Sequence, residues 1–561
     1  MRREASVVNK KVCSFPILSA LLALLIGTCA VVFPASAQAA PTSNGSITVS
    51  GTVANSYDAY QIFSANVVDG DNDAKIATDL AWVSDAVRDA ALPVLHGAGM
   101  PKSQTTAQEA AEWLNNDSHL TSALSAQLAR SLQSSVAVSE ALKAGTTAEL
   151  PCGYWLIVAD DAISQGEAGT APIMALVGGS AVTVKPKAAT PKVAKHVLED
   201  GTAAWQKAAD ATVADDLYWR LSATVPAGLT AYDTYTVRFV DTMSAGLDPS
   251  KVAASMRVYV AAGADGGFDA VSAGKDGRAG TEPAQGWTDI TAQCATKVAA
   301  DGTFTVRTGD LIAALGGTEA FTAGARVVAV YNAPLNSACN HGTAKGNPNE
   351  VYLRYPRSPF ADQSGDAGFT RTPSDDACAY TWDLALTKRG SDGDKPLAGA
   401  VLSIADDRGR TLAAEGTWDA EGKATVTTGE DGRVTVSGVD SGKLEVRELM
   451  APKGYTAFEG TRSVTVKAEG LDVDQVAAAK PKLTITAESP LRADSSDGST
   501  GSLEASLINT PTGTPPSITT GGFMPSTGDM AMYAAAAAAV AGAALIVVAL
   551  LVKRGGGSHK E

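Results

Sequence analysis

The sequence predicts a mainly β fold: tandem immunoglobulin-like β-sandwich domains, some helix in the N-terminal domain, and a C-terminal transmembrane helix. Alternating apolar and polar residues recur through much of the chain, and Gly- and Asp-rich turns separate these short segments. The chain of 561 residues is too long for one core, so about three domains are expected. At both ends of the chain the apolar residues form long continuous runs and do not alternate with polar residues.

The first 39 residues are predicted to be a secretory signal peptide. Four basic residues among the first eleven precede an apolar stretch from about 15 to 33, and small residues at 35–39 offer cleavage points. Cys29 alone does not indicate a lipoprotein, because the residues before it fit that cleavage pattern poorly. The mature chain is therefore expected outside the cell.

The N-terminal domain is expected over residues 40–188 and mixes helix with strand. Leucines that recur every fourth residue after Asp117 and Ser118 predict an amphipathic helix with a capped start. These leucines are Leu120, Leu124, Leu128 and Leu132. The segments 153–158 and 173–177 are predicted to be strands.

A middle β-sandwich domain is expected over residues 189–366. Alternation at 235–240, 257–260 and 351–355 indicates short strands. The mostly polar segment 362–376 is interpreted as a linker or loop.

A third β-rich domain is expected over residues 376–511. The segment 512–523 is rich in Thr, Pro and Gly, which is typical of an extended stalk.

Charge and cysteine content restrict the partners and the compartment. The net charge of −15 and the pI near 4.9 argue against nucleic acid as a partner. Four cysteines remain after signal cleavage, and disulfides persist outside the cell. Three pairings are possible. Cys294 with Cys339 is preferred because both lie in one predicted domain, and Cys152 with Cys378 follows only by elimination.

The C-terminal end combines a short polar motif, an apolar run and a basic end. The run 530–552 is long enough to span a bilayer, since about 20 residues suffice. Lys553 and Arg554 then mark the cytoplasmic side. A plain single-pass anchor would share these two features.

The motif before that run resembles the LPxTG signal of Gram-positive surface proteins cut by sortases. Its five positions are Met524, Pro525, Ser526, Thr527 and Gly528. Met524 replaces the usual Leu with a flexible apolar side chain of similar size. The resemblance implies cleavage after Thr527, a thioester between its carbonyl and the enzyme, and covalent attachment to the cell wall.

The third domain carries a Lys, a Glu and an Asn in a recognisable order. Lys388 ends the strand 384–388, Glu448 lies in the segment 444–455, and Asn509 lies near the end of the last strand. This pattern resembles a Cna B-type domain of a sortase-assembled pilin, whose E-box is usually written YxLxETxAPxGY. The resemblance implies an isopeptide bond between Lys388 and Asn509, promoted by Glu448.

Physical chemistry supports these residue types. Amine attack on a carboxamide requires a neutral Lys, and burial lowers the pKa of a Lys while raising the pKa of a Glu. Without such burial, the three side chains would be two solvated charges and a turn former.

The segment 182–187 resembles the pilin motif of shaft subunits, usually written as ending VYPK. Lys187 takes the place of the Lys that attacks the sortase-bound Thr of the next subunit, although Lys185 stands where Tyr is usual. Lys185 and Lys192 are alternative acceptors, and a basic interdomain linker is the simpler interpretation.

The middle domain resembles the second domain of the same pilins. The resemblance implies a bond between Lys195 and an Asn shortly after the last strand, with Asp241 as helper. No Asn follows Tyr355 in the run 356–359. A second isopeptide bond is therefore predicted to be absent.

The function predicted from these features is that of a pilus shaft subunit, with Lys187 of one copy joined to Thr527 of the next. The expected partners are a polymerising class C sortase, a housekeeping sortase, identical subunits, peptidoglycan and a possible host or surface ligand. The alternative is a monomeric wall-anchored adhesin or a tip or basal subunit. The sequence offers no metal-ligand spacing, cofactor motif or nucleophile triad, so an enzyme is not expected.

Overall fold

The computed structural model describes residues 43–513 except for 52–55, 72–73, 117, 160–170, 187–189, 228–230, 264–284, 322, 342–344, 360, 362 and 415. The predicted signal peptide, Lys187, the motif 524–528 and the apolar run 530–552 lie outside the described residues. Within the described part of the chain, no helix is long and apolar enough to cross a bilayer.

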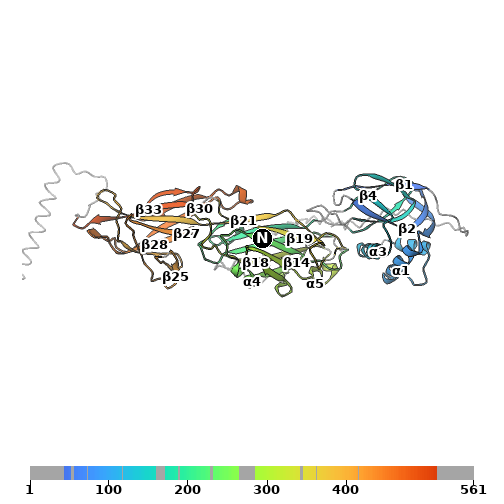
Figure 1. Cartoon of the computed structure of the whole chain (residues 1–561), viewed down its shortest axis with the longest axis horizontal. Coiled ribbons are helices and arrows are strands. Elements are labelled where there is room, and N and C mark those ends of the chain that lie inside the picture. Colours follow the sequence, from blue (N-terminus) through green and yellow to red (C-terminus); the bar gives the residue numbers. More distant parts are fainter. Residues whose placement is uncertain are drawn as a thin grey trace, which may run out of the picture.

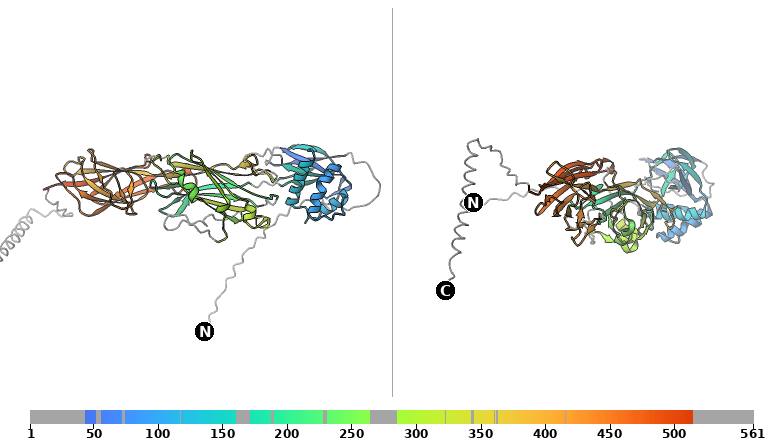
Figure 2. Two further views of the ribbon diagram at one scale, coloured as in Figure 1. Left: turned by 60° about the horizontal axis from the view of Figure 1, so that its bottom comes forward. Right: turned by 60° about the vertical axis from the view of Figure 1, so that its left-hand side comes forward.

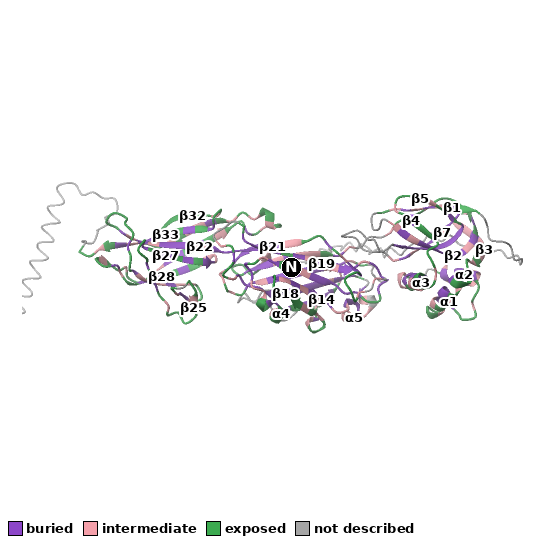
Figure 3. Ribbon diagram, viewed as in Figure 1, coloured by how far each residue is buried: buried purple, intermediate pink, exposed green. Residues whose placement is uncertain are grey.

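Three units follow one another along a single long axis (Figures 1 and 2). The N-terminal unit covers 43–186, the middle unit 190–380 and the C-terminal unit 381–513. Each unit has its own buried interior, and the exposed residues lie mainly on loops and outer faces (Figure 3). The mainly β fold with tandem sandwiches is confirmed.

The described residues of the N-terminal unit form three helices and eight strands. In chain order these are β1 (Asn44–Val49), β2 (Ser56–Asp69), β3 (Lys75–Trp82), α1 (Asp85–Gly97), α2 (Ala107–Leu114), α3 (Ser122–Ser135), β4 (Glu140–Lys143), β5 (Thr147–Pro151), β6 (Gly153–Ala159), β7 (Ile173–Val177) and β8 (Val182–Val184). The helices pack on one face of the sheet β3-β2-β6-β7, and the small sheet β5-β1-β8 packs on the other.

Helix α3 corresponds to the helix predicted from the leucine spacing. Leu124, Leu128 and Leu132 are buried in the helix-facing core, but the helix begins later than predicted. Its N-cap is Thr121, whose hydroxyl accepts a hydrogen bond from the backbone N–H of Leu124 at 3.1 Å. Thr121 and Ser118 are both suitable N-cap residues and lie three positions apart, so the sequence pattern alone does not decide between them.

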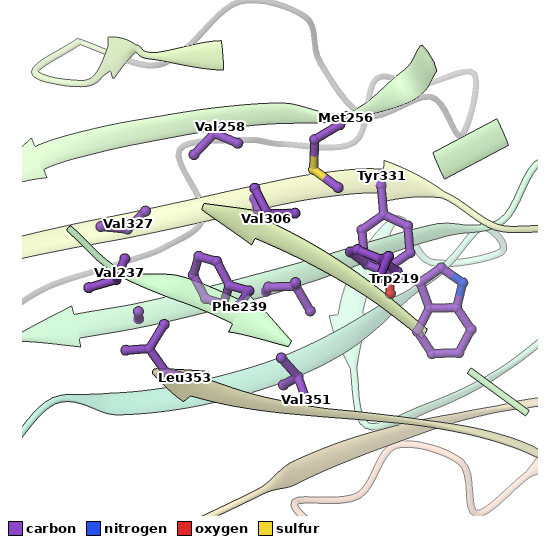
Figure 4. Close-up of a cluster of buried hydrophobic side chains, with 14 of the residues drawn as sticks. Trp219, Val237, Phe239, Met256, Val258, Val306, Val327, Tyr331, Val351 and Leu353 are labelled. Carbon is purple, nitrogen blue, oxygen red and sulfur yellow. The ribbon is translucent and has the colours of Figure 1, made fainter. Parts of the chain in front are cut away.

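The middle unit is a sandwich of two sheets with the strand orders β10-β9-β12-β18-β14-β15 and β11-β21-β19-β13-β17-β16, and β20 pairs with β19. Its strands are β9 (Lys192–Glu199), β10 (Ala204–Gln206), β11 (Ala208–Asp210), β12 (Tyr218–Val225), β13 (Arg238–Met243), β14 (Arg257–Ala262), β15 (Thr288–Asp289), β16 (Ala295–Val298), β17 (Thr303–Arg307), β18 (Ala325–Asn332), β19 (Asn347–Pro356), β20 (Phe369–Arg371) and β21 (Asp375–Tyr380). Its short helical turns are η2 (Pro249–Lys251), α4 (Val252–Ser255), η3 (Thr291–Gln293), α5 (Leu311–Ala314) and α6 (Thr318–Phe321). Aliphatic and aromatic side chains from both sheets fill the space between them (Figure 4).

The C-terminal unit is a second sandwich, with the orders β27-β22-β33-β29 and β25-β24-β23-β28-β30-β31; β32 pairs with β33 and β26 with β23. Its elements are β22 (Trp382–Gly390), β23 (Val401–Ala405), β24 (Thr411–Leu412), β25 (Trp418–Asp419), β26 (Val426–Thr427), β27 (Arg433–Val439), β28 (Gly442–Met450), β29 (Tyr455–Thr456), β30 (Thr461–Glu469), η4 (Val476–Ala478), β31 (Lys482–Ala487), β32 (Leu491–Asp497) and β33 (Ser502–Pro511). The first and last strands, β22 and β33, are parallel neighbours.

The boundary between the middle and C-terminal units lies later than predicted. The segment 362–376 was expected to be a linker or loop, but β20 and the start of β21 fall in it and pair with β19 of the middle sheet. Thr381 alone separates β21 from β22. Composition alone does not distinguish a polar segment that pairs at the side of β19 from a polar linker.

The predicted disulfides are absent: the four cysteines in the described part of the chain are free. Cys152 lies beside the Ser43 hydroxyl in the N-terminal unit, whereas Cys378 lies on β21, so the pairing by elimination joined different units. The Cys294 thiol donates to the carbonyl of Ile290, and Cys339 lies in the turn before β19. Burial raises the pKa of Cys294 to about 11 and that of Cys378 to about 12.

Candidate crosslinking sites

Lys388, Glu448 and Asn509 each occupy an inward position of a strand whose other inward positions are apolar. On β28 the inward residues before Glu448 are Leu444 and Val446, because buried and exposed positions alternate along this strand. Lys388 on β22 and Asn509 on β33 continue the inward rows of their strands in the same way. The strand period therefore directs three polar side chains into one apolar interior.

The three side chains meet between the two sheets of the C-terminal unit. Both Lys388 and Glu448 have fully buried side chains, with 3.3 Å between the Lys388 Nζ and the Glu448 Oε1. The Asn509 amide Nδ2 donates to the same Oε1 at 2.8 Å, and the backbone N–H of Phe458 donates to Oε2 at 3.1 Å. The Asn509 Oδ1 is buried without a hydrogen-bond partner in the described structure.

This geometry suits transfer of a proton from Lys to the amide nitrogen. Burial lowers the pKa of Lys388 to about 8, although the Glu448 carboxylate opposes that shift. The amine is thus neutral far more often than on a solvated surface. One carboxylate oxygen faces both the amine and the amide nitrogen, so Glu448 can accept a proton from the first and deliver it to the second.

A second site of the same kind lies in the middle unit. Lys195 on β9, Asp241 on β13 and Asn349 on β19 are all inward and have no solvent exposure. Lys195 forms an ion pair with the Asp241 carboxylate, and its Nζ donates to the Tyr331 hydroxyl at 2.9 Å. The Asn349 Nδ2 donates to that hydroxyl at 2.9 Å.

Burial affects both partners of the middle ion pair. It lowers the pKa of Lys195 to about 8 and raises the pKa of Asp241, and in each case the partner's charge opposes the shift. The Lys195 ammonium lies 5.6 Å from the ring of Trp219 and 5.5 Å from the ring of Tyr331, two residues at one end of the middle core (Figure 4). The Asn349 Oδ1 has no hydrogen-bond partner within the described residues.

The structure removes the reason for predicting that the middle unit has no crosslink. That prediction searched for an Asn after Tyr355, but Asp241 pairs with Val351 across the sheet, and Asn349 is the next inward residue beside it. The run from Asn349 to Tyr355 alternates buried and half-buried or exposed positions, which places Asn349 on the inward side of β19.

The comparisons with known proteins identify the domain type of the C-terminal unit. A family model described as "SpaA: Prealbumin-like fold domain" matches residues 383–480. The C-terminal unit is therefore similar to SpaA-type domains over this range. Lys388 and Glu448 lie inside the matched range of this SpaA-type domain, and Asn509 lies beyond it on its last strand.

A curated relative matches about a quarter of the chain. The trypsin-resistant surface T6 protein of Streptococcus pyogenes serotype M6 is 29% identical over 143 residues, which is 24% of each chain. The chain therefore spans about a quarter of the length of this relative. Together with the SpaA-type domain, this match confirms the predicted resemblance to Gram-positive pilin subunits.

Several solved pilins resemble the chain over most of its length. The T6 backbone pilin of serotype M6 Streptococcus pyogenes has 16% identity and a TM-score of 0.47, covering 85% of this chain and 100% of its own. The major pilin SpaD of Corynebacterium diphtheriae has 16% identity and a TM-score of 0.40, covering 83% and 98%. The major pilin subunit BcpA of Bacillus cereus has 10% identity and a TM-score of 0.37, covering 84% and 99%.

The two predicted intersubunit residues, Lys187 and Thr527, lie outside the described residues. Strand β8 ends three residues before Lys187, and the backbone N–H of Ser50 donates to the carbonyl of Val184 at 2.9 Å. The alternative acceptors Lys185 and Lys192 are both exposed. The edge of the N-terminal unit thus leads directly into the predicted acceptor segment.

Proposed function

We propose that this chain is the shaft subunit of a covalently polymerised pilus on a Gram-positive cell surface. The buried Lys388–Glu448–Asn509 cluster in a SpaA-type domain carries the proposal, because such a set of polar groups is costly to bury without a chemical use. The similarity to a streptococcal surface protein supports the same conclusion.

Polymerisation joins Thr527 of one copy to Lys187 of the next. A class C sortase cleaves after Thr527 and holds the new carbonyl as a thioester, and the Lys187 amine attacks that carbonyl and releases the enzyme thiol. A housekeeping sortase then joins the completed fibre to peptidoglycan. Lys185, two residues before the proposed acceptor, is exposed, and this supports access of a sortase to this part of the chain.

Each sandwich also forms one internal isopeptide bond. The neutral Lys388 Nζ attacks the side-chain carbonyl carbon of Asn509, the C–Nδ2 bond breaks, and ammonia leaves. Glu448 takes the proton from the amine and returns it to the departing nitrogen, so the carboxylate is regenerated. Lys195 and Asn349 react in the same way, with Asp241 as the proton carrier and Tyr331 holding the amide.

The internal bonds would help a fibre to carry tension. Strands β22 and β33 are parallel neighbours, and the Lys388–Asn509 bond joins them near the ends where Gly390 is opposite Asn509. Force that enters along the first strand can then leave along the last without unfolding the other strands. This property suits a shaft that is loaded along its length.

Production of the chain together with a class C sortase tests polymerisation on denaturing gels. The expected result is a ladder of high-mass products that Lys187→Ala abolishes. Matched controls are Lys185→Ala and Lys192→Ala, which should keep the ladder because these side chains flank the acceptor on either side. A ladder that survives Lys187→Ala would refute the Lys187 assignment.

The absence of any ladder would instead favour the alternative function, a monomeric wall-anchored adhesin or a tip or basal subunit.

Intact mass of the purified chain tests the internal bonds separately. A loss of two ammonia molecules relative to the sequence mass is expected, one from each sandwich. A loss of one would remove either the Asn349 or the Asn509 assignment, and peptide mapping would identify which.

A further inference from the structure

A cluster of four carboxyl groups lies at the junction of the middle and C-terminal units, away from both crosslinking sites. Glu199 ends β9, Asp200 follows it, and Asp210 ends β11, all in the middle unit. Asp440 comes from the turn between β27 and β28 of the C-terminal unit. The cluster therefore spans the boundary at which the two sandwiches meet.

Asp210 connects the two units directly. Its Oδ2 accepts hydrogen bonds from the Trp382 indole at 2.6 Å, from the Ser441 backbone N–H at 2.9 Å and from the Ser441 hydroxyl at 2.6 Å. Its own backbone N–H donates to the Glu199 Oε2 at 3.2 Å. The Asp210 carboxylate is thus held by three donors, which come from two residues of the C-terminal unit.

The other three carboxyls have much weaker compensation. The Asp440 Oδ1 is buried without a hydrogen-bond partner within the described residues. Glu199 accepts only backbone N–H groups among the hydrogen bonds described, and the nearest guanidinium to Asp200, that of Arg408, lies 3.3 Å away and also pairs with Asp215. Asp200 and Asp440 line a cavity of about 150 Å³. The other charged residues that line it are Asp215, Asp406, Asp407, Arg408, Arg410 and Lys443.

Burial and mutual repulsion favour protons on this cluster. Burial, followed by the charge of Asp210, raises the pKa of Glu199 to about 8. Burial also raises the pKa of Asp200. Burial raises the pKa of Asp440 well above its usual range, and the charges of the other three carboxylates add to this shift. A protonated carboxyl can donate a hydrogen bond to a neighbouring carboxylate, which a fully ionised cluster cannot do.

We propose that the cluster of Glu199, Asp200, Asp210 and Asp440 is a proton-dependent lock between the middle and C-terminal sandwiches. The junction is closed while the cluster retains a proton, and it loosens when all four groups ionise. This property belongs to the single chain and does not depend on polymerisation.

The direction of the pH dependence follows from linkage. The pKa of Glu199 is about 8 in the folded junction and 4.5 when the group is unperturbed, so the closed state binds more protons than the open state between these values. The stabilisation is fully present below pH 4.5, and it is lost as the pH rises through about 8. Release of one proton changes the opening equilibrium by up to about tenfold per pH unit.

A second contact between charged groups at the same junction must be separated from the cluster. The His341 Nδ1 lies 2.9 Å from the Asp383 carboxylate of the other unit, and this contact is an ion pair only when the imidazole is protonated. A His341→Gln variant removes its contribution and leaves the carboxyl cluster intact.

Hydrogen–deuterium exchange of the full chain in detergent, from about pH 6 to pH 9, tests the lock. Exchange rates are divided by the intrinsic rate at each pH. Peptides that cover 208–210 and 438–444 should lose protection as the pH rises, whereas peptides from β6 in the N-terminal unit should not. Glu199→Gln should remove the slope, and Glu445→Gln, an exposed carboxyl on β28, should keep it.

Asp440→Asn is the second variant and should also flatten the slope, so a folding failure of one variant leaves the other decisive. A flat profile in the unmodified chain would overturn the proposal, as would a slope that persists in both variants or vanishes in His341→Gln. Restoration of protection near pH 9 by millimolar calcium chloride would also overturn it, because the cluster would then hold a cation in place of a proton.

Discussion

Replacement of Glu448 by Gln tests the proposed crosslinking chemistry with little change in shape. Gln has the same size as Glu and can still accept the hydrogen bond from the Phe458 N–H, but it cannot carry a proton between Lys388 and Asn509. The variant is therefore expected to fold without the bond in the C-terminal unit.

The expected loss of stability follows from the loop that the bond closes. Lys388 and Asn509 enclose about 120 residues, and the chain-entropy rule for such a loop gives about 5 kcal/mol. A domain of about 130 residues has an unfolding entropy near 0.27 kcal/mol/K, so the Tm of the C-terminal unit should fall by about 15–20 °C. The buried amine, which loses its carboxylate partner, adds to this loss.

Calorimetry and intact mass measure the two consequences on the same sample. The unmodified chain should lack two ammonia molecules, and Glu448→Gln should lack one relative to its own sequence mass. Glu445→Gln is the matched control, because its exposed carboxyl lies on the same strand and it should keep both bonds. A Glu448→Gln variant that loses two ammonia molecules would refute the role of Glu448, whatever its Tm.

Three further predictions concern the middle unit, the buried amine and the junction. Asp241→Asn should prevent the bond from Lys195 and leave the C-terminal bond intact, so intact mass should show one ammonia lost; a loss of two would exclude Asp241 as proton carrier. Asn509→Ala should keep Lys388 unreacted, with a pKa of about 8 in the folded state and 10.5 unperturbed. Between these two pKa values the unfolded state binds more protons than the folded state. Chemical denaturation should therefore show a free energy of unfolding that rises with pH by up to about 1.4 kcal/mol per pH unit. A free energy of unfolding that falls with pH would contradict the burial of the amine. Asp215→Asn should weaken the pairing with Arg410 across the junction, and exchange at peptides 406–412 should increase severalfold while β6 stays unchanged; no increase would show that the pair contributes little.

Much of the architecture could be predicted from alternation alone. The segments predicted as strands at 173–177 and 384–388 correspond to β7 and to part of β22. Lys388, Glu448 and Asn509 were predicted from a motif, and the structure brings them together because each is the next inward residue of an apolar row. At this site the strand period and the motif therefore predict the same three inward residues.

The missed features depend on contacts that are remote in sequence. Asn349 could be recognised only by knowing that Val351 is opposite Asp241, since the register between β13 and β19 decides which Asn enters the site. The polar segment at 362–376 resembled a linker because β20 pairs only with β19 and the part of β21 in this segment precedes its pairing with β11. The expected disulfides failed because membership of one domain does not bring two thiols within bonding distance.

The inward register of Asn509 would give the proposed crosslink a role in quality control. A slip of β33 by one residue relative to β22 would turn Asn509 to the solvent and leave Lys388 without a partner. The proposed bond could form only after the strands have found their native alignment, and it would not be reversed once ammonia had gone. Each finished bond would thus record that its sandwich folded correctly, and misfolded chains would remain unmarked and open to proteases.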